Sequence, residues 1–397
     1  GGGGGGPGRG ANPARAGGAP RVSPTERPGA GALRPRAAHP GGISDAHCDH
    51  PLTGQGQAGR VGREEADLKE PLLQVQDIRM VFRNKKQEFA AVDGLSFQVE
   101  RGEILGIVGE SGSGKTMASL SIMGLLPEQG VIASGSIKYQ GKELVGLSDA
   151  EMCKIRGKEI SMIFQEPIMS LDQVFTVGSQ LMEGILTHEK MSREDAKKRA
   201  LEMLNLVGIP SPERVFHSYP FELSGGMRQR VMIAIALSCN PTLLIADEPT
   251  TALDVTIQAQ IMDLLKKSRD QFNIGIILIT HDLDVVKDMA DRIIVMYGGN
   301  MMESATREQL FSNPAHPYTR GLLRAIPRLD TGDERLFNIE GTVPDIRNMP
   351  AGCHFCTRCW DAQERCKTEH PQLVEIEPGH FVACHLAGEG RKEGEAV

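Results

Sequence analysis

The sequence predicts an α/β protein, and two kinds of segment support this fold class. Continuous apolar runs of strand length occur at residues 104–109, 242–246 and 275–280, and such runs are typical of strands buried on both faces of a parallel sheet. Segments with helical periodicity lie at about 178–239 and from about 255 onward. Strands that alternate with helices in this way predict an α/β sheet.

The segments before and after this region differ from it in composition. Residues 1–68 are a low-complexity tail of Gly, Pro, Ala and Arg, beginning "GGGGGGPGRG", and we expect it to be disordered because it buries too little apolar surface. From Leu72, "LLQVQDIRMVF" and "AVDGLSFQVE" predict two strands joined by a polar turn. Beyond about residue 327 the sequence is rich in loops, so residues 328–390 are expected to form a small Cys-rich C-terminal module.

Composition and charge narrow the class of protein. The chain has 397 residues, 40% of them hydrophobic, which supports one or two globular domains. A net charge of −7 and a pI of 5.9 disfavour nucleic acid as a partner. No apolar run approaches the 18 residues that predict a membrane span, and the N-terminus has no apolar signal-peptide core. We therefore expect a soluble, cytoplasmic protein.

A phosphate-binding motif follows the first apolar run. "GESGSGKT" fits the pattern G-x-x-x-x-G-K-[ST] and precedes "TMASLSIMGLL", which reads as a helix. Its glycines let backbone N–H groups surround a phosphate chain, Lys115 would reach the β- and γ-phosphates, and the Thr116 hydroxyl would bind Mg²⁺. A chance glycine-rich turn is the alternative when the motif is taken alone. The expected nucleotide-binding residues here are Gly109, Glu110, Ser111, Gly112, Ser113, Gly114, Lys115 and Thr116.

Two carboxylates follow a second apolar strand in "LLIADEP". Asp247 is placed to hold Mg²⁺, usually through water, and Glu248 to act as the general base toward the attacking water. Polar residues also follow other strands: Gln165 in "MIFQEP" and His281 in "LITHD". Such residues can sense a water or a γ-phosphate at strand tips, although each of these features alone is more often an ordinary turn.

"ELSGGMRQR" places a second phosphate receptor at the start of a helix. Ser224 is the expected N-cap, and Gly225 and Gly226 allow close backbone approach. One site does not need two such receptors from one chain, so this helix start is expected to bind the γ-phosphate held by another subunit. The alternative is an ordinary helix start.

Taken together, in this order, these motifs resemble the ATP-binding subunits of ABC transporters over residues 72–327. The resemblance implies an ABC-type P-loop ATPase with a RecA-like core sheet, an antiparallel β subdomain and an α-helical signature subdomain, using ATP and Mg²⁺. It makes Gln165 the Q-loop residue and a Mg²⁺ ligand, Asp254 the D-loop residue and His281 the switch histidine. The usual adenine-stacking Tyr is absent, which leaves Phe82 and Phe89 as candidates. The stretch "SLDQVFTVG" (170–178) also departs from the family pattern, which more often reads Leu-Asn-Pro.

The C-terminal part resembles one branch of that family. "NPAHPYTRGLLRAIP", "GTVPDIRNMPAGCHF" and "HFVACH" are similar to the dipeptide, oligopeptide and nickel uptake branch. The resemblance implies an ATP-hydrolysing motor for di- or oligopeptide import, with nickel as the alternative. DNA-repair ABC ATPases are the other class, disfavoured by the single cassette and the acidic charge. Expected partners are a second, related ATP-binding subunit, two multi-span permeases and, indirectly, an extracytoplasmic substrate-binding protein. The chain would lie peripherally at the cytoplasmic face of the cell membrane.

A cysteine cluster ends the sequence. Four thiolates suffice for a [4Fe–4S] cluster or a Zn²⁺ site, and clustered cysteines in a reducing compartment are more often metal ligands than disulfides. By the resemblance, the favoured ligands are Cys353, Cys359, Cys366 and Cys384, with Cys356 as an alternative. Unligated thiols are the other interpretation. The neighbouring His354, His380 and His385 are expected to be structural or solvated.

Overall fold

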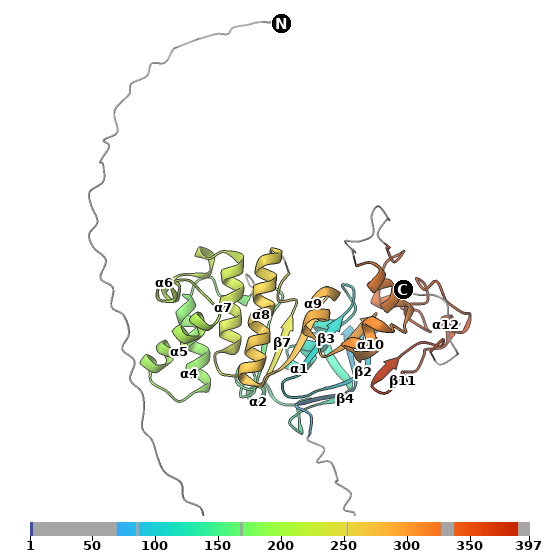
Figure 1. Ribbon diagram of the computed structural model, residues 1–397, viewed down its shortest axis with the longest axis horizontal. Coiled ribbons are helices and arrows are strands. Elements are labelled where there is room, and N and C mark those ends of the chain that lie inside the picture. Colours follow the sequence, from blue (N-terminus) through green and yellow to red (C-terminus); the bar gives the residue numbers. More distant parts are fainter. Residues whose placement is uncertain (3–69, 85–86, 167–169, 252, 327–336, 388–397) are drawn as a thin grey trace, which may run out of the picture. The chain divides into compact units, whose positions relative to one another are not determined.

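The computed structural model describes Gly1, Gly2 and residues 70–387, except 85–86, 167–169, 252 and 327–336. The chain divides into two units, Gly1–Ala66 and Asp67–Val397, and the fold below is that of the second unit (Figure 1). The disorder predicted for residues 1–68 lies outside the described residues, apart from the first two glycines. Within the described ranges, no helix is both long and apolar enough to cross a bilayer.

A large mixed sheet forms the centre of this unit. Its strands are β3 (Ile104–Val108), β6 (Ile160–Ile163), β7 (Leu243–Asp247), β8 (Gly275–Thr280), β9 (Arg292–Tyr297), β10 (Asn300–Thr306), β11 (Val374–Glu377) and β12 (His380–Val382). They are ordered β11-β12-β10-β9-β3-β8-β7-β6. The part from β9 to β6 is parallel, as the apolar runs predict. The three strands beyond β9 pair antiparallel, so β12 joins the cysteine-rich region to the central sheet through β10.

A second, antiparallel sheet comes from the two predicted N-terminal strands and a later hairpin. It contains β1 (Leu73–Asn84), β2 (Gln87–Val99), β4 (Gly130–Tyr139) and β5 (Lys142–Glu143) in the order β2-β1-β4-β5. Phe82 and Phe89 lie opposite each other on β1 and β2, and both are half-buried. The predicted antiparallel β subdomain is confirmed.

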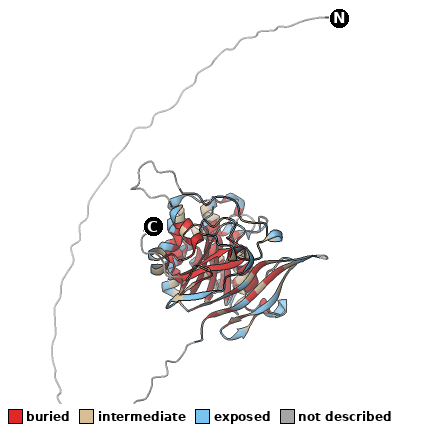
Figure 2. Cartoon of the chain, turned by 90° about the vertical axis from the view of Figure 1, so that its right-hand side faces the viewer, coloured by how far each residue is buried: buried red, intermediate tan, exposed pale blue. Residues whose placement is uncertain are grey.

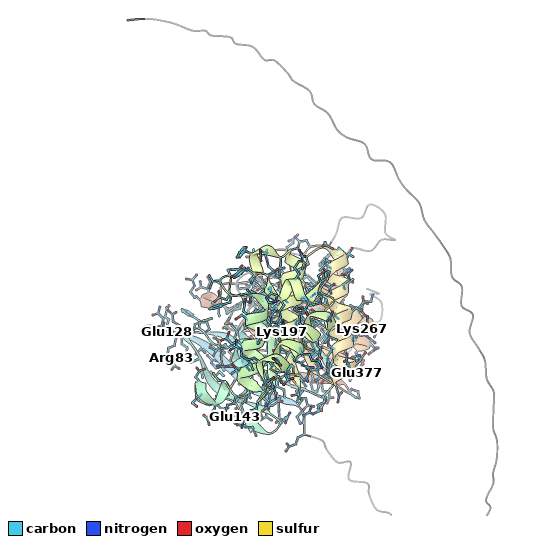
Figure 3. All side chains as sticks on the ribbon, turned by 90° about the vertical axis from the view of Figure 1, so that its left-hand side faces the viewer. Arg83, Glu128, Glu143, Lys197, Lys267 and Glu377 are labelled. Atoms are coloured by element: carbon cyan, nitrogen blue, oxygen red, sulfur yellow. The ribbon has the colours of Figure 1, made fainter. Side chains whose placement is uncertain are left out.

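Helices cover the central sheet and group at one end of it. They are α1 (Lys115–Met123), α2 (Asp149–Met152), α4 (Val177–His188), α5 (Arg193–Leu206), α6 (Pro212–His217), α7 (Gly225–Leu237), α8 (Val255–Phe272), α9 (Leu283–Met289), α10 (Arg307–Ser312), α11 (Pro317–Arg324) and α12 (Arg365–Thr368), with 3₁₀ turns η1 (Pro220–Glu222) and η2 (Ile346–Asn348). Helices α4 to α7 form a group beside α8, on the left in Figure 1. Lys197 of α5 and Lys267 of α8 lie on the helical face seen in Figure 3.

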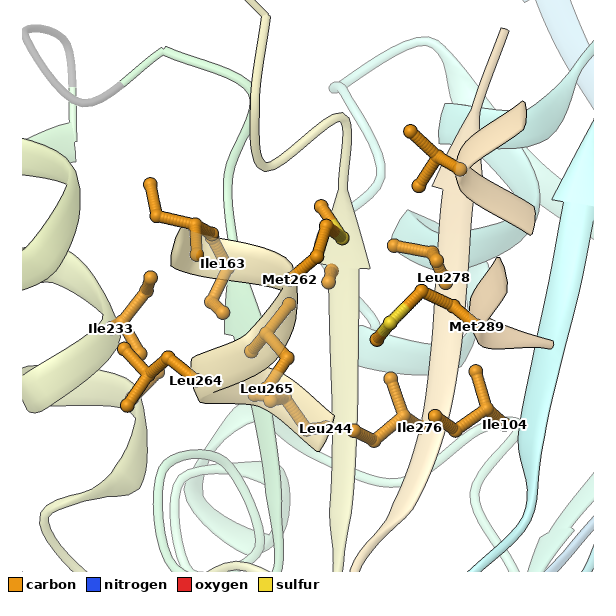
Figure 4. Packing of buried hydrophobic residues seen from close by; sticks show 14 of the residues in the cluster. Ile104, Ile163, Ile233, Leu244, Met262, Leu264, Leu265, Ile276, Leu278 and Met289 are labelled. Carbon is orange, nitrogen blue, oxygen red and sulfur yellow. The ribbon is translucent and has the colours of Figure 1, made fainter. Parts of the chain in front are cut away.

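The parallel strands are buried on both faces, as continuous apolar sequence requires. In β8, Ile276 and Leu278 pack in the core under the helices, while Ile277 and Ile279 pack on the side of the antiparallel sheet, because successive strand side chains point to opposite faces. Figure 4 shows Met262 and Leu265 of α8 among the residues of the first core. In Figure 2 buried residues fill the sheet interior and exposed residues lie on the outer elements. This packing fixes the strand ends that carry the predicted site residues.

Candidate functional site

The phosphate-binding loop connects β3 to α1, and its glycines are required by close backbone approaches. A Cβ on Gly109 would lie 2.2 Å from the Met296 carbonyl oxygen, and one on Gly114 would lie 2.5 Å from the Ala91 carbonyl oxygen. Gly114 has a φ of 97° and is the N-cap of α1, a conformation that only glycine adopts without strain. The loop is therefore packed against β9 and β2 as well as joined to β3.

Lys115 is folded into this loop. Its side chain is buried, and Nζ donates to the carbonyl oxygens of Gly109 at 2.7 Å and Glu110 at 3.0 Å. Burial lowers the pKa of Lys115 most strongly, and the nearby charges of Glu248 and Asp247 oppose that shift. The ammonium group thus lies under the loop, where the sequence predicts that it meets phosphate.

Asp247 ends β7 as predicted and is 2% exposed. Burial raises the pKa of its carboxyl group, against a hydrogen bond from Thr116. Its Oδ1 atom has no hydrogen-bond partner among the described residues. A buried carboxylate oxygen without a partner, beside a threonine hydroxyl, is the donor set that Mg²⁺ takes. The two residues therefore fit the metal role that the sequence assigns to them.

Glu248 is held by three side chains and by an unusual backbone conformation. Oε2 accepts from Gln165 Nε2 at 2.9 Å and from the Thr251 hydroxyl at 2.8 Å, and Oε1 lies 3.3 Å from His281 Nδ1. Its φ is 45°, and its N–H donates to the Ile279 carbonyl at 2.9 Å. Positive φ at a residue with a Cβ stores strain that surrounding contacts must hold. The carboxylate is thereby fixed in one direction.

The pKa of Glu248 lies below its ordinary value despite partial burial. Burial is the largest single influence and raises it, but the Thr251 hydrogen bond and the contact with His281 together outweigh burial. Glu248 is therefore kept as a carboxylate, the protonation state that a general base needs.

One open cleft of about 470 Å³ collects the first residues of the phosphate-binding loop and the predicted strand-end residues. It is lined by Gly109, Glu110, Ser111, Gln165, Glu248 and His281, together with Val108, Leu283 and Leu322. The cleft lies at the carboxyl ends of parallel strands, where α/β proteins bind ligands. Its volume is in the range of small-molecule sites.

The predicted signature residues line a different cleft. Ser224 caps α7 by accepting from the Met227 N–H at 3.4 Å, and Asp254 caps α8 by accepting from the Ile257 N–H at 3.0 Å. With Gly225 and Gly226 they line a cleft of about 400 Å³. The structure therefore brings the signature and D-loop residues together, and separates them from the phosphate-binding loop of the same chain.

Three residues that contact the site were not among those predicted from the sequence. Thr251 binds Glu248, the Tyr318 hydroxyl accepts from the Glu110 N–H at 2.9 Å, and Arg358 Nη1 donates to the Glu110 carboxylate at 2.9 Å. Thr251 could have been found from its position three residues after Glu248 in a tight turn. Tyr318 and Arg358 lie in "HPYT" and "CTRC", and no local signal links them to the phosphate-binding loop.

The five C-terminal cysteines are gathered around one small cavity. Its lining includes Cys353, Cys356, Cys359, Cys366 and Cys384, with His316, Phe355 and Asp361. Burial raises the pKa of Cys353 to about 11 and that of Cys359 to about 12, with neighbouring thiols adding to both. In the part of the chain that the structure describes, no three His, Cys, Asp or Glu side chains form a group able to hold a metal ion. Thiols are suitable metal ligands, but among the described residues these cysteines are not arranged as a complete set of metal ligands.

The three histidines near these cysteines have structural contacts. His354 Nδ1 donates to the Gly298 carbonyl at 2.7 Å, and His380 Nε2 lies 2.7 Å from Glu303 Oε1 in a fully buried pair. His385 Nε2 lies 2.9 Å from the Glu369 carbonyl oxygen. Each ring is thus paired with a group of the fold.

Comparison with known proteins agrees with this geometry. Residues 92–251 match the model of the ABC transporter family, and residues 302–366 match the oligopeptide/dipeptide transporter C-terminal region. The oligopeptide transport ATP-binding protein AppD of Bacillus subtilis is 52% identical over 79% of this chain and 96% of its own length. The dipeptide transport ATP-binding protein DppD of Haemophilus influenzae is 48% identical over 79% of this chain and 95% of its own.

This chain is an ABC transporter ATP-binding subunit.

A solved structure supports the same fold. The ABC transporter cassette MJ0796, described as a dimer, superimposes with a TM-score of 0.54 at 29% identity, covering 59% of this chain and 98% of that one. A second structure of that cassette is a post-hydrolysis state bound to ADP and phosphate. The predicted ABC ATPase fold is confirmed, and the subunit is an ATPase of this family.

Proposed function

We propose that this ATP-binding subunit hydrolyses ATP to power the import of di- or oligopeptides through separate permease subunits. One observation carries the proposal: a cleft lined by Gln165, Glu248 and His281 and the peptide-transporter C-terminal region occur in one chain. The relatives AppD and DppD are named for oligopeptide and dipeptide transport, which favours peptides over nickel as the substrate.

The residues of the cleft suggest how hydrolysis proceeds. Amides of residues 109–116 and Lys115 bind the phosphate chain, while Thr116 and Asp247 would hold Mg²⁺, with Gln165 beside them. Magnesium supplies positive charge that offsets the charge developing on the phosphate oxygens. Glu248 accepts a proton from the attacking water, whose oxygen bonds to the γ-phosphorus as the bond to the β-phosphate oxygen breaks. His281 and Thr251 hold Glu248 in position, and the products are ADP and phosphate.

The signature cleft is proposed to act on ATP bound by a second subunit. Ser224, Gly225, Gly226 and Asp254 lie around their own cleft, away from the phosphate-binding loop. The start of α7 presents free N–H groups and the positive end of a helix. Two subunits facing each other would bring this helix start to the partner's γ-phosphate. We infer a related ATP-binding chain as that partner.

An exposed apolar surface beside the Gln165 loop is proposed to contact the permeases. Val174 is 73% exposed, Phe175 54% and Phe221 62%, and the Phe221 ring stacks on Tyr219 at 5.5 Å. The Val177 N–H donates to the Ser218 carbonyl at 2.9 Å, which ties the two loops together. Multi-span permeases would couple substrate passage to movement of this surface. The chain would then lie peripherally at the cytoplasmic face of the membrane, with a substrate-binding protein delivering ligand from the other side.

A metal site at the cysteine cavity is proposed as a structural element. Cys353, Cys359, Cys366 and Cys384 would hold a [4Fe–4S] cluster, or Zn²⁺ as the alternative, with Cys356 able to replace one ligand. Such a group would cross-link loops that have little core of their own, which adds to folding free energy. The support is the convergence of the thiols on one cavity. Anaerobic purification should give about four iron and four sulfide per chain. Cys366→Ser should lose them, and the exposed Cys153→Ser should not. Absence of both iron and zinc from the wild-type protein would contradict the site.

The proposed function is tested by ATPase stimulation in the assembled transporter. The chain is purified with the permeases of its own operon or membrane, and its hydrolysis rate is measured with the substrate-binding protein empty, peptide-loaded or loaded with Ni²⁺. We expect stimulation by the peptide-loaded form. Stimulation by the nickel-loaded form alone would assign the chain to nickel uptake, and DNA-stimulated hydrolysis would place it in the repair class.

A further inference from the structure

Glu110 in the phosphate-binding loop is held at both ends by residues far outside the loop. Its backbone N–H donates to the Tyr318 hydroxyl, 208 residues away in sequence. Its carboxylate accepts from Arg358 Nη1, at 3.1 Å to Oε1 and 2.9 Å to Oε2, across 248 residues. The first residue after the loop's leading glycine is therefore anchored to the C-terminal region.

Arg358 is itself fixed in one orientation. Its side chain is 5% exposed, Nε donates to the Glu340 carbonyl at 3.0 Å, and Nη2 donates to the Ile339 carbonyl at 3.1 Å. Nη1 also lies 3.3 Å from the Tyr297 hydroxyl. A guanidinium bound on every nitrogen loses little freedom when it holds a carboxylate. The guanidinium side of the ion pair with Glu110 is thus held in place and buried, while the Glu110 side chain is 30% exposed.

The phosphate-binding loop needs a cation beside Glu110, because Glu110 brings a negatively charged carboxylate into a loop that binds negatively charged phosphates. A triphosphate must approach the backbone of Glu110 and Ser111, and a carboxylate free to turn into the cleft would repel it. The negative charge of Glu110 also raises the pKa of the nearby Lys115, against the larger effect of burial. Arg358 neutralises this carboxylate and directs it toward the C-terminal segment.

A second contact joins the same segment to the loop. His354 donates to the Gly298 carbonyl, and the neighbouring Gly299 N–H donates to the Ser113 carbonyl at 3.1 Å. Residues 353–359 therefore have two sets of contacts. Cys353, Cys356 and Cys359 line the cysteine cavity. Arg358 contacts the phosphate-binding loop, and His354 contacts the Gly298–Gly299 turn that bonds to it.

We propose that Arg358 is a positioning residue for the phosphate-binding loop: by neutralising and holding Glu110, it sets the affinity of the loop for the triphosphate. The C-terminal segment thereby contributes to nucleotide binding without touching the nucleotide. This inference takes from the proposed function only that the loop binds ATP.

The test compares ATP affinity in four full-length proteins: wild type, R358M, E110Q and the double variant. Binding of a fluorescent ATP analogue with Mg²⁺ is measured, and thermal unfolding checks the fold. R358M should weaken binding about 10- to 100-fold, the range for loss of a charged hydrogen-bonding partner. E110Q/R358M should recover most of that loss, because the unpaired carboxylate is gone.

Arg347 offers a matched control in the same segment. It pairs with Asp345 at the surface, and R347M should leave ATP affinity unchanged. The proposal is overturned if R358M binds like R347M, or if removing the Glu110 charge restores nothing. It is also overturned if R358M and E110Q/R358M both fail to fold, because the contact is then purely structural. Absence of ATP binding in the folded wild type would instead reject the proposed function.

Discussion

Gln165 and Glu248 lie beyond the ends of the adjacent parallel strands β6 and β7, and the Gln165 amide donates to Glu248 Oε2 at 2.9 Å. The two residues are 83 positions apart in sequence. Gln165 precedes Phe175, in the exposed apolar surface, by about ten residues in the sequence. The contact therefore links the candidate base to the surface proposed to meet the permeases.

Replacing Glu248 by Gln should separate ATP binding from hydrolysis. The amide keeps the size of the side chain but cannot accept the proton of the attacking water. Hydrolysis in the assembled transporter should fall about 10²- to 10⁴-fold, while ATP affinity stays near wild type. Phosphate release and analogue binding measure the two quantities. Glu128→Gln, at an exposed turn, is the control. If the E248Q complex hydrolyses ATP at the same rate as the E128Q complex, Glu248 is not the general base.

Thr251→Val should shift the pH dependence of hydrolysis. The Thr251 hydrogen bond lowers the pKa of Glu248, so its loss raises that pKa, and the base is then protonated at a higher pH. The acid limb of the kcat/KM profile should move upward in pH relative to wild type. Thr187→Val, on the exposed side of α4, should leave the profile in place. A limb that does not move, or that moves downward, contradicts the role of Thr251.

Ser224→Arg should affect the complex and spare the isolated subunit. The substitution places bulk and charge at the start of α7, in a cleft separate from the phosphate-binding loop. ATP affinity of the monomer should be unchanged, and turnover of the assembled transporter should be lost. Ser192→Arg is a matched control, because Ser192 caps α5 in the same way at 3.1 Å. Loss of ATP binding by the S224R monomer would show that the segment serves its own subunit's site.

Glu303 and His380 form a buried pair whose contribution to stability depends on pH. Burial is the strongest influence on the Glu303 pKa and raises it, but hydrogen bonds from His380 and the Ala315 and His316 amides lower it below 4.5. A carboxylate whose pKa is lower in the folded state than in the unfolded state stabilises the fold at pH values above its unfolded-state pKa. This stabilisation is lost as the pH falls through the folded-state pKa. Glu303→Gln should cost about 1–3 kcal/mol at pH 7.

Urea unfolding at pH 7 and below pH 4.5 measures this contribution. The gap between wild type and E303Q should narrow as the pH falls. Glu308→Gln is the control, because Glu308 makes an exposed pair with Arg307, and it should change stability little at either pH. A gap that stays constant, or that widens in acid, contradicts the ionised state assigned to Glu303.

The sequence was sufficient to predict the parts of the fold that depend on local pattern. Strands β3, β7 and β8 are continuous apolar runs, and the phosphate-binding loop and the α7 cap are contiguous motifs. Gln165, Glu248 and His281 were each predicted to follow a strand, and they meet in one cleft because the ends of parallel strands lie at the same edge of the sheet.

The remaining features depend on contacts between distant segments. Strand β12 has three residues, too few to show a period, and its pairing with β10 is specified by tertiary packing. Arg358 and Glu110 form an ion pair only because the chain returns to the phosphate-binding loop after β10. The positive φ of Glu248 likewise has no signature in "ADEP", since it arises from the turn held by Thr251 and Ile279.

Peptide uptake by the reconstituted transporter is the decisive measurement of the proposed import function. This chain is reconstituted into liposomes with its permeases and companion subunit, and the liposomes are loaded with ATP. Labelled oligopeptide and the substrate-binding protein are added outside. We expect peptide accumulation that requires ATP, is lost in E248Q and persists in E128Q. ATP hydrolysis without peptide accumulation, or accumulation that continues at the same rate in E248Q, would contradict the proposed import function.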